Sequence, residues 1–102
     1  MVMFGMLRKN RKEIHGRTVY MEVCGANKVT YRVIAGHMSW FGEETAVYGI
    51  EAEDMESGET EVIPDFSRNI EDAVDFAEML ITSRSGPRQL YSKALNYLCI
   101  SI

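Results

Sequence analysis

The sequence has few residues of several types, and each shortage excludes a class of protein. Only two of its 102 residues are cysteine and only two are proline. Cys24 and Cys99 lie far apart and form no CxxC pair, which excludes a disulfide scaffold and a zinc site built from cysteines. No run of about 18 apolar residues is present, so we expect no membrane-spanning helix. The apolar content of 46% and the charged content of 25% are typical of a folded globular domain.

Histidine is equally scarce, and the motifs of common enzymes are missing. His15 and His37 stand alone, without the pattern of a Ser-His-Asp or Cys-His site. Residues 36–42 contain neither GxGxxG nor GxxxxGK[ST], so the loop that cradles a nucleotide phosphate is absent. A calcium loop counted from Glu53 has Pro64 at its twelfth position, where a glutamate is required. We therefore predict no catalytic residue, no metal site and no cofactor, and rank a small enzyme of unknown class third among the functions.

Charge is distributed unevenly along the chain. The net charge is −4, yet residues 1–17 hold five basic residues and one acid. Residues 43–78 hold 13 acids and only one basic residue, and such a body repels polyanions. A nucleic-acid-associated protein is therefore the alternative function, in which phosphate is contacted by Arg8, Lys9, Arg11 and Lys12. The order of an apolar segment followed by basic residues is the reverse of a secretory signal, so we expect cytoplasmic residence with two free thiols.

The periodicity of apolar residues predicts an α+β fold. Period-two alternation predicts strands, and a stripe from Ile70 to Ile81, after a capping Ser67 or Asn69, predicts a helix. Gly86 and Pro87 end that helix and precede a second one. We predict an antiparallel sheet of about four strands with two C-terminal helices packed on one face. The expected strands are 17–24, 28–35, 45–54 and 60–63, the expected helices are 70–83 and 88–99, and the domains are a basic flexible arm at 1–16 and a single α+β domain at 17–102.

Several short motifs carry a resemblance to a known family. They are Tyr-Gly-Ile at 48–50, Ile-Pro-Asp-Phe-Ser at 63–67, a helix with acids in its first turn, and Pro87 and Leu90 leading the last helix. Over residues 28–100 this pattern resembles a family of small uncharacterised proteins of Gram-positive bacteria, a domain of unknown function. The resemblance implies a small cytoplasmic bacterial protein without an assigned activity. It transfers no catalytic residue.

An aromatic loop is the first candidate binding site. Residues 36–44 read as a loop, and they contain His37 and the only tryptophan, Trp40, beside Phe41. Exposed rings there would anchor a protein partner, because aromatic anchors dominate binding hot spots. The alternative is that the rings close the end of a small core, which is favourable by about 2–3 kcal/mol for each large side chain. We expect at least one of the two rings in the core.

The sheet face away from the helices is the second candidate. If Val19 and Met21 point inward, then Tyr20, Cys24 and Ile34 lie on the outer face. Two helices cover only one face, so these residues are candidates for self-association. The alternative is that residues 1–7 cover them. Together these features predict a small non-enzymatic binding or regulatory module that acts through protein contacts, with itself as a homodimer or with another protein, and without a membrane.

Overall fold

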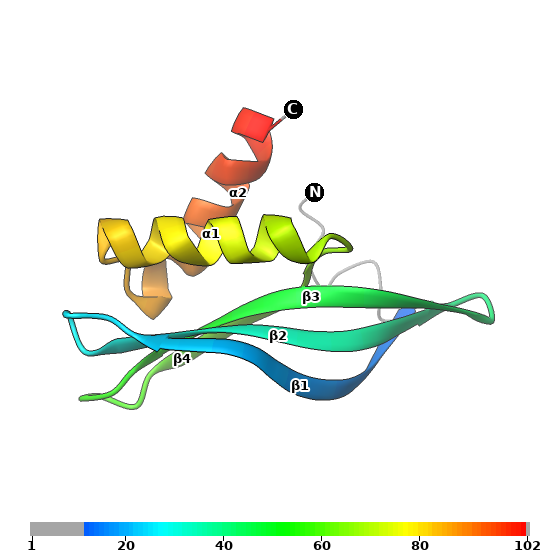
Figure 1. The fold of residues 1–102 in the computed structure, drawn as a ribbon, viewed down its shortest axis with the longest axis horizontal. Helices are drawn as coiled ribbons and strands as arrows, with labels where there is room; N and C mark the ends of the chain where they lie inside the picture. Colours follow the sequence, from blue (N-terminus) through cyan, green and yellow to red (C-terminus); the bar gives the residue numbers. More distant parts are fainter. Residues whose placement is uncertain (1–11, 102) are drawn as a thin grey trace.

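The computed structural model describes residues 12–101, with the side chains of residues 16–39 and 41–97. Four antiparallel strands form one sheet in the order β1-β2-β3-β4, and the two helices lie on one face of it (Figure 1). This arrangement confirms the predicted α+β fold. The elements are β1 (Lys12–Cys24), β2 (Val29–Trp40), β3 (Glu43–Asp54), β4 (Thr60–Ser67), α1 (Ile70–Ser83), a 3-10 helix η2 (Pro87–Gln89) and α2 (Leu90–Ser101).

The prediction of a loop at residues 36–44 is wrong, because β2 extends to Trp40 and β3 begins at Glu43. The pairing runs without a register shift from Val29 opposite Asp54 to Trp40 opposite Glu43. Only Phe41 and Gly42 turn the chain, and their φ angles are +54° and +84°. Two positive φ angles are typical of a tight hairpin turn whose twist matches that of the strands. The result is a long hairpin that projects beyond the start of α1 (Figure 1).

Strand β1 begins earlier than expected and is irregular. Residues 12–16, which the sequence placed in a flexible arm, belong to the strand, and residues 1–11 lie outside the described part. The register with β2 breaks between His15 and Thr18 and again between Val19 and Met21. Gly16 lies in the first break, with a φ of +76° that side chains rarely adopt. The two breaks are β-bulges, which bend an edge strand and change the direction of its side chains.

The second bulge corrects the predicted faces of β1. Val19 pairs with Ile34, whereas Met21 pairs with Val33. Neighbours along β2 point to opposite faces, so Val19 lies on the outer face and Met21 on the helix face. The expectation that both point inward is wrong, because one extra residue in a strand reverses the alternation beyond it.

Helix α1 is fixed at both ends by local chemistry. The Asn69 side chain accepts a hydrogen bond from the Glu71 backbone N–H at 2.9 Å, and Glu71 and Asp72 fill the first turn. Acids there interact favourably with the helix dipole. At the other end Arg84 adopts a left-handed conformation, and its N–H bonds to the carbonyl of Ile81. Of the two predicted caps, Ser67 and Asn69, the structure shows Asn69, and the predicted end near Ser83 is confirmed.

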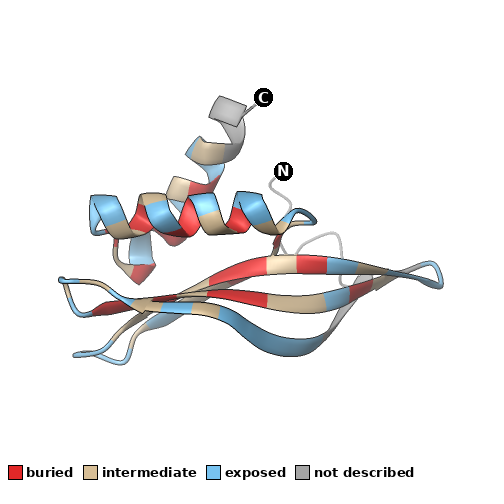
Figure 2. Cartoon of the chain, viewed as in Figure 1, coloured by how far each residue is buried: buried red, intermediate tan, exposed pale blue. Residues whose placement is uncertain are grey.

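The core lies between the helices and the sheet, as Figure 2 shows in red. Phe66 stacks on Phe76 with ring centroids 4.6 Å apart, and Tyr97 tilts against both rings. Burial, with smaller contributions from Asp72 and Asp75, raises the pKa of Tyr97 above its ordinary value. The buried cluster takes its sheet residues from β2, β3 and β4, namely Val29, Tyr31, Val33, Ile50, Ala52, Ile63 and Phe66.

Candidate functional site

The outer face of the sheet carries a ladder of ion pairs that sequence reasoning missed. Arg32 on β2 contacts Glu22 on β1 at 2.6 Å, and on β3 it contacts Glu53 at 2.9 Å and Glu51 at 3.7 Å. Arg17 on β1 pairs with the same Glu51. The hydrogen-bonded carboxylate of Glu22, aided by Glu53 and opposed by partial burial, raises the pKa of Arg32 above its ordinary value. Cross-strand register brings these charges together, so their spacing in the sequence gives no signal.

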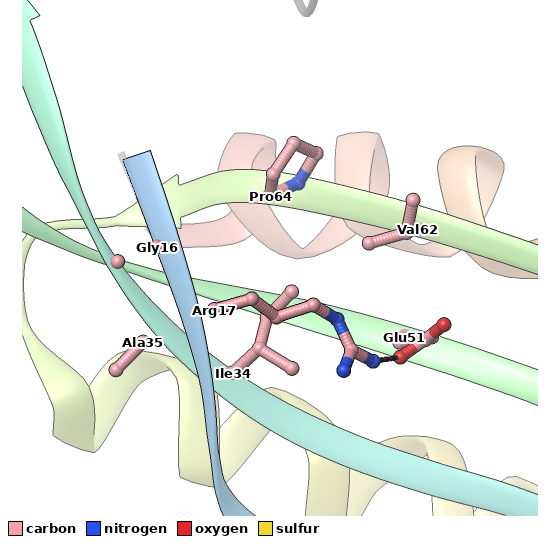
Figure 3. Close-up of a pocket in the computed structure, with 8 residues that line it drawn as sticks. Gly16, Arg17, Ile34, Ala35, Glu51, Val62 and Pro64 are labelled. Atoms are coloured by element: carbon pink, nitrogen blue, oxygen red, sulfur yellow. Dashed lines mark hydrogen bonds and ion pairs between the residues drawn. The ribbon is translucent and has the colours of Figure 1, made fainter. Parts of the chain in front are cut away.

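A cavity of about 200 Å³ lies beside this ladder (Figure 3). Its walls are mostly apolar, and the Arg17–Glu51 pair lies at one side. Both charges of the cavity are therefore already paired with each other. A pocket of this kind accepts a small apolar group more readily than a free ion. It is lined by Gly16, Arg17, Ile34, Ala35, Gly36, Glu51, Val62 and Pro64.

A second cavity, of about 190 Å³, lies on the opposite face at the same bulge. His37 and Tyr48 line it, and His37 is exposed. Tyr48 also packs against the main core, which identifies this as the helix face. The backbone register places His15 directly opposite His37. The two histidines of the chain, 22 residues apart in sequence, are thus neighbours across two strands.

The hairpin turn presents Phe41 to solvent. This side chain is 70% exposed and lines an open hollow together with Met38, Glu43, Thr45 and Arg68. Phe41 therefore does not belong to the core. The side chain of Trp40 lies outside the described residues, so the expectation that one of the two rings is buried stays a prediction for Trp40.

The residues predicted for self-association separate into two groups. Tyr20 is 61% exposed, and Cys24 is exposed with a free thiol. Ile34 is only 6% exposed, so within this chain it offers little surface to a partner. Val19, at 42% exposure, takes its place on the outer face. Gly16 lies in the first bulge of β1, whereas the second bulge, which separates the faces of Val19 and Met21, contains no glycine that would indicate it in the sequence.

The other candidates are placed only in part. Of the predicted phosphate contacts, Arg8, Lys9 and Arg11 lie outside the described residues, and Lys12 begins β1. Among the side chains that the structure describes, no three of His, Cys, Asp or Glu gather into a metal site. No helix in the described part of the chain is long and apolar enough to cross a membrane.

Comparison with known proteins finds no match. No model of a protein family, no curated protein and no solved structure is similar to this chain. The resemblance to a Gram-positive family of unknown function therefore stays a prediction. Function has to be inferred from the surfaces described above.

Proposed function

We propose that this protein is a non-enzymatic binding module that associates with a second copy of itself through β1. The observation that carries the proposal is the exposure of five consecutive residues, 16–20, in the middle of this edge strand (Figure 2). Val19 and Tyr20 are large apolar side chains within that segment. Within the described residues β1 pairs with β2 alone, so its other edge faces outward. Adjacent exposed apolar groups on a sheet edge are typical of a protein contact.

The charges around Val19 and Tyr20 favour a second copy as the partner. Arg17 precedes this apolar pair and Glu22 follows it, and both side chains remain about half exposed although Arg17 already pairs with Glu51 and Glu22 with Arg32 in the same chain. A second copy running antiparallel would place Arg17 of each chain near Glu22 of the other. A twofold contact needs such a self-complementary surface. The two bulges interrupt the edge, so the contact would be made by side chains rather than by a continued hydrogen-bond ladder.

The hairpin turn is a second contact surface, for a different protein. A non-glycine residue in the left-handed region costs about 1–2 kcal/mol, and Asn or Gly is usual at this turn position. Phe41 adopts this left-handed conformation, with a φ of +54°, and its ring is exposed. Strained, exposed aromatic residues are typical of functional contacts. Glu43 and Glu44 beside the turn favour a partner with basic groups.

Sedimentation velocity over a range of concentrations tests the proposal. We expect the wild type to form a reversible dimer. Tyr20→Ser should raise the Kd of the dimer at least about tenfold, as expected when a central aromatic anchor is removed. Phe41→Asn is the matched control, because it removes another exposed ring. It should keep the dimer and melt at a higher temperature, since it relieves the turn.

Two outcomes contradict the proposal. A wild type that stays monomeric at every concentration would exclude self-association. A dimer that is lost in Phe41→Asn and kept in Tyr20→Ser would move the contact from β1 to the hairpin turn.

A further inference from the structure

We infer that the cavity on the outer face of the sheet receives the Tyr20 side chain of a second copy of this chain. The inference rests on the proposed self-association through β1 and names the contact that anchors it. Gly16 and Arg17 line this cavity and also belong to the exposed segment 16–20 of β1. The cavity therefore lies beside the proposed interface, and residues of β2, β3 and β4 complete its walls (Figure 3).

The size and the walls of the cavity suit a tyrosine ring. Its volume is about 200 Å³. A cavity of about 150 Å³ is already large enough to hold benzene. Ile34, Val62 and Pro64 supply apolar walls for the ring, and the glycines Gly16 and Gly36 add no side chain that would fill the space. A ring bound there would be withdrawn from water, which is the main favourable contribution of an aromatic side chain at an interface.

The charged side of the cavity suits the hydroxyl of the same side chain. Arg17 contacts Glu51 through one terminal nitrogen, and the Arg17 side chain stays 51% exposed. A guanidinium has five N–H donors, so Arg17 can also donate a hydrogen bond to a tyrosine hydroxyl. Because the two charges are already paired, the cavity favours a neutral side chain with an apolar body and a polar end over a lysine or an arginine.

The second bulge of β1 makes Tyr20 available to another copy. The register with β2 passes from Val19 to Met21 and skips Tyr20, whose side chain is 61% exposed. The antiparallel contact that brings Arg17 near Glu22 of the other copy also places Tyr20 opposite the other Val19, two residues from Arg17. Diagonal neighbours of this kind are about 7–8 Å apart, within reach of an aromatic side chain. A twofold axis repeats the insertion, so each chain contributes one ring and one cavity.

The test fills the cavity from β4, the opposite edge strand of the sheet. Val62→Phe adds a ring inside the cavity, and sedimentation velocity should show the Kd of the dimer raised at least about tenfold. Thr60→Phe is the matched control, because it adds the same ring on the same face of β4 but outside the cavity lining. This control should dimerise as the wild type does. Thermal melts of both variants check that each chain folds.

A second measurement locates the ring without any substitution in the cavity. It uses a mixture of isotope-labelled and unlabelled wild-type chains. Isotope-filtered nuclear Overhauser spectra should show contacts from the Tyr20 ring of one chain to the Ile34 and Val62 methyl groups of the other. The filter removes contacts within a single chain.

The possible failures separate this inference from the proposed function. A dimer that is as tight in Val62→Phe as in the wild type, or that lacks the contacts between the Tyr20 ring and the cavity methyl groups, would overturn the inference and leave the self-association intact. Equal weakening in Thr60→Phe would show that the effect does not come from the cavity. A wild type that stays monomeric would contradict the proposed function and this inference together.

Discussion

At the scale of single residues, Tyr31 shows how a buried polar group fixes the two layers. Its ring is fully buried in the core, and its hydroxyl donates to the Ser85 carbonyl at 2.7 Å. The same hydroxyl accepts a hydrogen bond from the Asn27 side chain at 3.1 Å. One side chain thus connects β2, the turn before it and the segment after α1. A buried carbonyl that loses its donor costs more than the hydrogen bond itself contributed.

We predict that Tyr31→Phe lowers the free energy of unfolding by about 1–3 kcal/mol, because the buried Ser85 carbonyl loses its partner. Tyr91→Phe is the matched control. Its hydroxyl also donates to a carbonyl, that of Val62 at 2.8 Å, but the site is exposed and water can replace the hydroxyl. Tyr91→Phe should lower the free energy of unfolding by less than about 1 kcal/mol. Urea unfolding of both variants measures the difference, and equal losses would contradict the role assigned to Tyr31.

At the scale of elements, the sheet is shaped by irregular strands. In the β3–β4 pairing, Ile63 lies opposite Ile50 and Ser67 lies opposite Tyr48. Three residues of β4, 64–66, therefore lie opposite a single residue of β3. That one residue is Gly49, where an added Cβ would meet the Ile63 carbonyl oxygen and lie 2.7 Å from the Pro64 Cα. Backbone atoms cannot move aside as a flexible side chain can. The close approach of β4 therefore requires a glycine, and Pro64 and Val62 of β4 line the outer cavity beside it.

Gly49→Ala should therefore lower stability by about 1–3 kcal/mol, the usual cost of overpacking, or prevent β4 from pairing. Gly86→Ala is the control, because its Cβ would meet nothing within 4 Å and its φ of −89° suits any residue. That change should leave stability unchanged or raise it by less than about 1 kcal/mol, through a less flexible unfolded chain. Thermal melts of the two variants test this, and a neutral Gly49→Ala would show that β4 lies farther from β3.

At the scale of the whole molecule, the two layers do not match in extent. α1 covers β2, β3 and β4, whereas the middle of β1 and the far end of the hairpin lie beyond the helices (Figure 1, Figure 2). Both proposed contact surfaces and the paired histidines lie in this uncovered part. Stability is therefore uneven, because regions with few buried apolar contacts open at low free energy.

Amide hydrogen exchange measures this unevenness. We predict the strongest protection for the buried pairs of β2 and β3, at Tyr31 with Ala52 and Val33 with Ile50. Residues 16–20 of β1 should exchange much faster at low protein concentration, because they are exposed and the register is broken there. Their protection should rise with concentration if a second copy covers them. Equal protection of both segments at low concentration would show that the β1 edge is covered within one chain.

The sequence by itself determined the class of fold and the helices. The alternation of Val29, Tyr31 and Val33 and the stripe from Ile70 to Ile81 depend only on neighbours along the chain, and each element was predicted from them. The cap at Asn69 was readable for the same reason, since a side chain that bonds to a backbone two residues away is a local feature.

The tertiary structure alone decided the faces of β1, the length of the hairpin and the residues that meet across strands. Register arises from hydrogen bonds between strands, and one bulged residue reverses every face beyond it. No local pattern therefore indicates that Val19 points outward or that Arg32 meets Glu22. The pairing of His15 with His37 could not be predicted for the same reason, because it depends on the register of the bulged strand β1 against β2.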